Sequence, residues 1–478
     1  MNDRRAAYIY GNADLRLFSR EKAHRFKSFS RENSNYSAYP GGDRHLHSGI
    51  ILGILNGPGL ALAVFGCGVV LTVKLRAALN PKKLLRAFRG QSGEMPPVKA
   101  MCVALAGTLG VGNIAGVASA IAIGGAGTVF WMWASAFFAM VIKYAETVLA
   151  LGHRRGKHGG AFWYMLDSGA KWAAVIFSIL CLFASLTIGS SIQSNAAATC
   201  LEGQLGLDPR ICGVIFGVGA LIVISGGFGR ITGFIMTAVP VASVGYALIS
   251  IYIIITNLPC LPGVIAEIFG EALGVRAFAG GISGFLTSKA LSLGVTRGLV
   301  SNEAGCGTAP IAHSSSDAKD PAVQGVFGML EVAIDTLVLC TLTAFVVLIA
   351  RARGVGLPVD GMEAALAAFG GFLPFSGIFL SAAVTLFAFA TVICWFFYGS
   401  ECLRFLLKGG AQAESAVKFY RVVFALAAGV GAFTDGGPLW SASDLTIGAM
   451  TILNLFFVMK HSDSLRPAPL EVISKSEE

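Results

Sequence analysis

The sequence predicts an all-α integral membrane protein with about eleven transmembrane helices. Of its 478 residues, 55% are hydrophobic and 13% are charged, whereas an average soluble domain carries about 25% charged residues. The apolar residues form blocks of about 20 to 30, which is long enough for a helix to cross a hydrocarbon core of roughly 30 Å. Backbone groups in lipid must satisfy their own hydrogen bonds, so blocks of this length indicate helices rather than barrel strands.

Hydropathy places the expected spans within a few residues of these boundaries: 49–76, 98–122, 127–152, 170–201, 211–228, 231–256, 279–315, 321–350, 375–407, 417–434 and 439–460. The seventh is the least apolar, because it contains charged and polar side chains. Residues 77–97 have the pattern of a basic interfacial helix.

Lysine and arginine predict the orientation. They are frequent in alternate loops, for example in residues 74–99, 153–157 and 404–421, whereas the opposite loops hold four arginines: Arg210, Arg276, Arg351 and Arg353. The lysine-rich face is expected to be cytoplasmic. This places the N-terminus outside and the C-terminus inside a bacterial-type plasma (inner) membrane. The net charge of +9 then concerns topology and anionic lipids of the bilayer, and not nucleic acid.

The basic segment 1–47 disagrees with this topology, because it is translocated in this interpretation. Long tails often cross regardless of their charge. The segment equally fits a wrongly assigned start of the chain, and we assign it no function.

Glycines crowd the middle of the second span, "AGTLGVGNIAGVASA" (106–120). Each glycine weakens a helix by roughly 1 kcal/mol relative to alanine. One explanation is close packing at Gly112-x-x-x-Gly116. A dinucleotide motif is excluded because it requires a preceding strand. The alternative that we favour is a broken helix, because Thr108 and Asn113 place polar groups near the midplane.

A second interrupted segment supports this interpretation. Residues 290–310, "ALSLGVTRGLVSNEAGCGTAP", are also rich in glycine and polar side chains. Interrupted spans at matching places in two halves are typical of inverted-repeat secondary transporters, of which LeuT is an example. We expect a basic tail (1–47), an additional span with the interfacial segment (48–97), two five-span repeats of opposite topology (98–257 and 258–461) and a cytoplasmic tail (462–478).

Several segments resemble signature sequences of the sodium:alanine/glycine symporter family (alanine or glycine:cation symporters). They are "GTLGVGNIAGVASAI", "GGAGTVFWMWASAFFAMVIKYAETVLA", "TRGLVSNEAGCGTAPIAHSS", "EVAIDTLVLCTLTA" and "FAFATVICWFFYG", and the resemblance runs in collinear order from about residue 49 to 460. It implies a LeuT-type fold and alternating-access symport of alanine or glycine with Na⁺. Alternatives are coupling to H⁺ and a LeuT-type carrier for a different small solute. We expect a monomer without an organic cofactor.

The chain departs from the family pattern at four positions. It has Ala126 and Thr128 in "GGAGT" where the family usually has "GGPGA", and Val300 where the family usually has phenylalanine. Ala390-Thr391 replaces a common Ser-Thr pair. The missing serine removes one possible hydroxyl ligand, which bears on ion affinity and ion identity.

The resemblance also implies a binding site at the first break. Backbone N–H groups around Val111 and Gly112 would bind the carboxylate, in a turn that also contains Thr108, Gly110 and Asn113. A Na⁺ site would combine the carbonyls of Ala106 and Leu109 with the Thr391 hydroxyl. Trp395, one turn after Thr391, would wall the pocket. Ser292 and Gly294 would add backbone oxygens from the second break.

Three further polar side chains are candidates on chemical grounds. Asp335 lies deep in the eighth span, where an acid is usually functional. It either meets the substrate ammonium or forms a structural pair with Arg297 or with a Ser/Thr hydroxyl. Gln193 and Asn195 point about 200° apart on a helix. We assign Gln193 to the site and Asn195 to helix packing.

The remaining buried charges are expected to be structural. Lys143 and Glu146 are i,i+3 neighbours that can pair, and Arg297, Glu303 and His313 are interpreted as a gate or a cytoplasmic-side network. An intramembrane enzyme is disfavoured because the sequence shows no nucleophile–base or metal-ligand set. A channel would need a continuous polar file or a filter ring.

Overall fold

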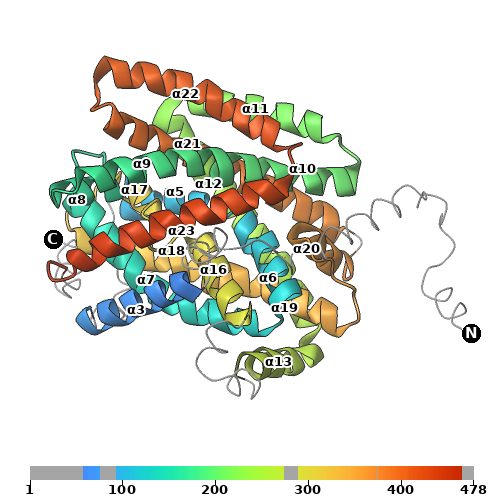
Figure 1. The fold of residues 1–478 in the computed structure, drawn as a ribbon. Coiled ribbons are helices and arrows are strands. Elements are labelled where there is room, and N and C mark those ends of the chain that lie inside the picture. Colours follow the sequence, from blue (N-terminus) through green and yellow to red (C-terminus); the bar gives the residue numbers. More distant parts are fainter. Residues whose placement is uncertain (1–57, 76–92, 274–288, 374, 466–478) are drawn as a thin grey trace, which may run out of the picture. The chain divides into compact units, whose positions relative to one another are not determined.

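The structure is a computed structural model that describes residues 58–75, 93–273, 289–373 and 375–465. These residues fold into helices joined by turns and loops (Figure 1). These ranges contain no strand, and an isolated bridge joins Arg155 to His158. The predicted all-α fold is therefore confirmed. The expected tail (1–47) and most of the expected interfacial helix (77–97) lie outside the described residues.

The helical elements follow one another along the chain with short connections. In order they are α3 (Pro58–Lys74), α5 (Pro97–Thr108), η3 (Gly112–Gly116), α6 (Val117–Gly124), α7 (Gly127–Gly152), α8 (Ala161–Asp167), α9 (Lys171–Leu186), η4 (Thr187–Ser191), α10 (Ile192–Leu205), α11 (Pro209–Ser225), α12 (Gly227–Thr256), η5 (Leu258–Cys260), α13 (Leu261–Leu273), α16 (Lys289–Asn302), α17 (Ala309–His313), α18 (Pro321–Val332), η6 (Ala333–Cys340), α19 (Thr341–Ala352), α20 (Gly361–Gly370), α21 (Ser376–Leu406), α22 (Gly410–Gly431) and α23 (Gly436–Lys460).

Six helical stretches are long and apolar enough to cross a membrane, and the bent stretch 97–124 makes a seventh if it counts as one span. The six are Gly127–Gly152, Lys171–Leu205, Gly227–Thr256, Pro321–Ala352, Ser376–Leu406 and Gly436–Lys460. All seven coincide with expected spans. The other four expected spans fall on α3, α11, α16 with α17, and α22, which do not reach the same limits by themselves. The total of eleven spans and the inverted repeat stay predictions.

The first interruption lies where the glycines predicted it. Helix α5 ends at Thr108, Leu109 leaves the helical region with ψ 85°, and the direction of the chain turns by 58° before η3 and α6. Close packing does not explain Gly112 and Gly116. A methyl group there would lie 3.5 Å from Ser301 Cα and 3.8 Å from Arg297 Cδ, which are ordinary contact distances.

The second interruption is a six-residue turn, 303–308, between α16 and α17. Three of its residues have left-handed backbone conformations: Glu303 (φ 52°), Gly305 (φ 80°) and Gly307 (φ 82°). Two of these positions are glycine because L side chains rarely adopt this conformation. The Glu303 backbone is strained.

Three π-helical segments interrupt the α-helical pattern: η3, η4 and η6. Such segments often occur at functional sites. Here η3 contains Asn113, η6 contains Asp335, and Gln193 follows η4 by two residues. Helix α21 packs against α5, α9, α10 and α12, and α7 packs against α16 and α18. These contacts bring the interruptions and the candidate side chains to one region.

Candidate functional site

Two backbone N–H groups at the first interruption donate to side chains instead of to their own helix. Gly110 N–H donates to Asn113 Oδ1 at 3.1 Å, and Val111 N–H donates to Gln193 Oε1 at 3.2 Å. In a continuous helix these groups would donate to carbonyls four residues earlier. Adjacent amide donors at a helix start can bind a carboxylate, and here two amide oxygens already hold them in place.

The carbonyls on the other side of the interruption face α21. Thr391 Oγ1 donates to Leu109 O at 3.2 Å, and Trp395 Nε1 donates to Gly107 O at 3.3 Å. Thr391 and Trp395 are both 1% exposed. Carbonyl and hydroxyl oxygens of this kind suit a hard cation. The structure thus brings together Leu109 and Thr391, two of the three residues that the resemblance implies for Na⁺; Ala106 is buried in the last turn of α5.

The Asp335 carboxylate connects the two interrupted helices. It accepts hydrogen bonds from Asn113 Nδ2 at 2.6 Å, from Ser301 Oγ at 2.6 Å and from Thr336 Oγ1 at 2.8 Å. Its partners are therefore an amide and hydroxyl groups, and not Arg297. Arg297 instead pairs with Asp444 at 3.4 Å and lies over the Trp440 ring.

A narrow pocket adjoins the first interruption and is lined by Leu109, Gly110, Asn113, Ile114, Tyr246, Leu339 and Phe387. In this conformation it does not admit a water-sized sphere. Tyr246 Oη bonds to Thr343 Oγ1 at 2.6 Å, and Thr343 donates to Asn113 O at 2.9 Å. Sequence reasoning missed Tyr246, Leu339 and Phe387, because single apolar or aromatic residues in a span carry no signal of their own.

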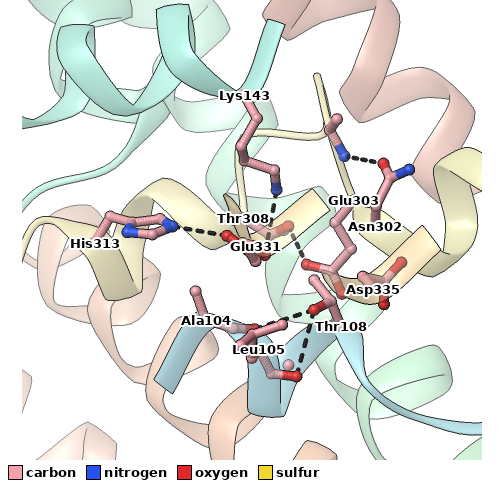
Figure 2. A network of polar contacts seen from close by, with 12 residues as sticks. Ala104, Leu105, Thr108, Lys143, Asn302, Glu303, Thr308, His313, Glu331 and Asp335 are labelled. Atoms are coloured by element: carbon pink, nitrogen blue, oxygen red, sulfur yellow. Dashed lines mark hydrogen bonds and ion pairs between the residues drawn. The ribbon is translucent and has the colours of Figure 1, made fainter. Parts of the chain in front are cut away.

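Three predicted site residues, Ser292, Gly294 and Thr108, make contacts other than those expected. Ser292 and Gly294 lie inside the regular helix α16, and a methyl group at Gly294 would lie 2.5 Å from Thr128 O. This position corrects the expectation that they supply oxygens from the second interruption. The Thr108 hydroxyl bonds to carbonyls of its own helix at Ala104 and Leu105 (Figure 2).

The structure also gives the surroundings of two other residues from the sequence analysis, Asn195 and Gly112. Asn195 donates to Gly431 O and Thr434 O, which confirms its role in helix packing. Gly112 lies beside Ser301 at the end of α16.

A buried cluster of charged groups surrounds the second interruption (Figure 2). Lys143 Nζ lies 3.5 Å from Glu146 Oε1, which confirms the expected pair, and 3.7 Å from Glu331 Oε1. Glu331 was missed. A lone acid in an apolar helix gives no indication of its partner, which here includes His313 at 2.7 Å.

A separate polar cluster lies where the segment after α7 meets α21. His158 Nδ1 lies 2.7 Å from Glu401 Oε2, and Arg404 Nη1 lies 2.8 Å from Glu401 Oε1. The hydrogen bond and the charge of Glu401 raise the pKa of His158 above its ordinary value of 6.5.

Comparison with known proteins shows which sequences this chain resembles. Residues 47–465 match the sodium:alanine symporter family. The chain is 34% identical to the sodium/alanine symporter AgcS of Methanococcus maripaludis over 84% of this chain and 90% of that one. It is 33% identical to the amino-acid carrier protein AlsT of Bacillus subtilis, with 83% and 85% covered. It is 30% identical to the probable sodium/glutamine symporter GlnT of Bacillus subtilis, with 83% and 84% covered.

One solved structure shares the fold at low sequence identity. A Na⁺-coupled sialic acid symporter, in its substrate-bound outward-open state, superposes with a TM-score of 0.55 at 14% identity, over 86% of this chain and 98% of that one. The family match covers most of the chain and agrees with the relatives. The chain is a multi-pass membrane transporter, not an enzyme, and it belongs to the sodium:alanine symporter family.

Proposed function

We propose that the protein carries a small neutral amino acid, alanine or glycine, together with Na⁺ by alternating access within a LeuT-type inverted repeat. The observation that carries this proposal is the pair of redirected amides at Gly110 and Val111, beside the Leu109–Thr391 contact. The two amides provide donors for an anion, and the Leu109 carbonyl and Thr391 hydroxyl provide oxygens for a cation, within one break of a helix. A carrier that couples an amino acid to Na⁺ needs both kinds of group.

The substrate carboxylate would replace the two side-chain oxygens that now accept from the broken helix. Asn113 Oδ1 and Gln193 Oε1 occupy the acceptor positions. A carboxylate presents two oxygens and a full negative charge, and bonds to a charged acceptor are about twice as strong as neutral ones. Binding would therefore release Asn113 and Gln193 to rearrange, and such a local change can start closure of a carrier.

Na⁺ would bind on the carbonyl side of the same break, at Leu109 and Thr391, with Ala106 as a further carbonyl ligand. A cation there strengthens the carboxylate site through its charge. By linkage, alanine must then increase Na⁺ affinity by the same factor by which Na⁺ increases alanine affinity.

The pocket walls favour a small side chain. Leu109, Ile114, Leu339 and Phe387 supply apolar surface beside the break, and Trp395 packs against Gly189, where an added methyl group would lie 2.4 Å from Trp395 Cβ. This packing leaves the indole little room to move. Glycine and alanine are therefore expected to fit better than glutamine.

Uptake in proteoliposomes tests the proposal. Radiolabelled alanine should accumulate with an inward Na⁺ gradient and not with an inward K⁺ gradient, and preloaded unlabelled alanine should drive counterflow. Glycine, D-alanine and glutamine are then added as competitors. Uptake that is independent of Na⁺, or competition by glutamine alone, would contradict the proposed ion or substrate, and flux without counterflow would indicate a pore.

A further inference from the structure

Five buried ionisable side chains meet at the second interruption. Lys143, Glu146, Glu331 and His313 are 0% exposed and Glu303 is 3% exposed. Figure 2 shows Lys143, Glu331, His313 and Glu303 converging from α7, α18, α17 and the turn 303–308, and Glu146 Oε1 lies 3.5 Å from Lys143 Nζ. Three carboxyl groups in so small a buried volume raise the question of what balances their charge.

The neighbours of His313 fix its protonation. Gln324 Nε2 contacts Pro97 O at 3.2 Å, and the same nitrogen contacts His313 Nδ1 at 2.7 Å. A carbonyl oxygen can only accept, so the Gln324 atom between them donates to both, and Nδ1 must accept. The proton of neutral His313 then lies on Nε2, which donates to Glu331 Oε2 at 2.7 Å. His313 adds no positive charge.

Lys143 is therefore the cation available to three carboxyl groups. Its Nζ makes no hydrogen bond and lies 3.5 and 3.7 Å from Glu146 and Glu331. The nearby arginines are occupied elsewhere. Arg154 donates to the carbonyls of Ser314 and Ser316, and Arg297 pairs with Asp444. A buried carboxylate without a cation is strongly disfavoured and takes up a proton instead.

Glu303 is the carboxyl group with the least support for a negative charge. Glu146 Oε2 accepts from Gly307 N–H at 3.1 Å and from Asn454 Nδ2 at 2.9 Å. Glu331 accepts from His313. Glu303 has one hydrogen bond in this set, of 2.5 Å, with Thr308 Oγ1, and within the described ranges it forms no ion pair.

Apart from Lys143, the titratable groups near Glu303 supply no positive charge. They are the acids Glu331 and Asp335, and the neutral thiols and phenol of Cys306, Cys181, Cys394 and Tyr398. The described residues contain no group of three or more His, Cys, Asp and Glu side chains that could hold a metal ion. A proton on one of the three carboxyl groups lowers the uncompensated negative charge without a further cation.

We propose that Glu303 is a proton-binding site, protonated in this conformation, and that it exchanges its proton when the turn 303–308 changes shape. The strained backbone at Glu303 (φ 52°) favours such a change. Proton occupancy does not depend on the substrate. The exchange during transport rests on the proposed function.

Infrared spectroscopy of the purified protein tests the occupancy. Wild type near neutral pH should show a carboxylic-acid C=O band that shifts in D₂O. Glu303→Gln should remove this band, and the matched buried control Glu146→Gln should keep it. If Glu303→Gln does not fold, Glu303→Asp should shift the band. The absence of a band in wild type, its persistence in Glu303→Gln, or its loss in Glu331→Gln instead would overturn the proposal.

Counterflow in proteoliposomes tests the exchange. One controlling proton gives a change of up to about tenfold per pH unit, so wild-type exchange should depend on pH and Glu303→Gln should lose that dependence. A wild-type rate that does not vary with pH, or equal dependence in both proteins, would overturn the exchange. A failure of alanine transport itself would leave the infrared result unaffected, so the two proposals can fail separately.

Discussion

Asn113 Nδ2 donates a hydrogen bond of 2.6 Å to Asp335 Oδ1. The same Asn113 accepts from the Gly110 amide through its oxygen, and the same Asp335 accepts from Ser301 at the end of α16. One side-chain pair thus connects the first broken helix to the helix that precedes the second interruption.

Replacing Asn113 with alanine should weaken both the fold and substrate binding. Gly110 N–H and Asp335 Oδ1 would lose their partner, and each unsatisfied buried group costs about 1–3 kcal/mol. We expect a lower thermal midpoint, and a raised KM for alanine uptake because the turn loses the side chain that holds the Gly110 amide in place. Asn195→Ala removes an amide that donates to the carbonyls of Gly431 and Thr434, so it should lower stability and leave KM unchanged. Equal KM effects in the two variants would count against the site.

Removing the Thr391 hydroxyl should reduce apparent Na⁺ affinity. Losing one oxygen ligand at about 1–2 kcal/mol corresponds to roughly a 5- to 30-fold higher Na⁺ half-saturation in Thr391→Ala, and Thr391→Ser should keep most of the affinity. The control is Thr385→Ala on the same helix, because Thr385 Oγ1 bonds to Ser381 O at 2.7 Å. An unchanged half-saturation in Thr391→Ala would rule out this ligand.

A methyl group at Gly110 should disturb the carboxylate site directly. It would lie 2.8 Å from Gln193 Oε1 and 2.9 Å from Thr391 Oγ1, so both side chains must shift. We expect Gly110→Ala to weaken alanine binding by about tenfold, or about 1.4 kcal/mol. Gly203 in α10 has open space around it. Gly203→Ala should bind normally and gain about 0.5–1 kcal/mol of stability, which calorimetry can measure.

The His158–Glu401 pair should make stability fall as pH rises. The pKa of folded His158 lies above its ordinary 6.5, so below 6.5 the charged pair contributes fully, and its contribution is lost as pH rises through the folded pKa. The His158 side chain is 59% exposed, so the change in thermal midpoint should be at most about 2 °C. His158→Gln should lose this fall in stability above about pH 6.5. A wild-type slope retained in His158→Gln would assign it to another group.

The first interruption could be predicted because glycine and midplane polar groups are local signals. The partners of Asp335 could not, because periodicity shows which face a residue occupies and not what lies opposite. Sequence left Arg297 and a Ser/Thr hydroxyl as alternatives, and tertiary packing selected Ser301 and Thr336 together with Asn113.

The position of the second interruption was predicted only as a broad segment. Its turn is set by left-handed residues at 303, 305 and 307, and a glycine in the sequence does not reveal the sign of its φ. The π-helical segments carry no comparable signal. Each π-helical segment rotates the side chains that follow it relative to those before it. Residue spacing therefore predicts that Thr391 and Trp395 share a face of the uninterrupted helix α21, but it does not predict shared faces across η4 or η6.

Helix α21 holds the first half of the broken helix at three carbonyls. Cys394 Sγ donates to Val103 O, Trp395 Nε1 to Gly107 O and Thr391 Oγ1 to Leu109 O. The second half, α6, packs instead against α16, α19 and α20. A rocking motion of these two groups of helices would therefore bend the chain at Leu109. Helix α5 would move with α21, and α6 would stay with α16, α19 and α20.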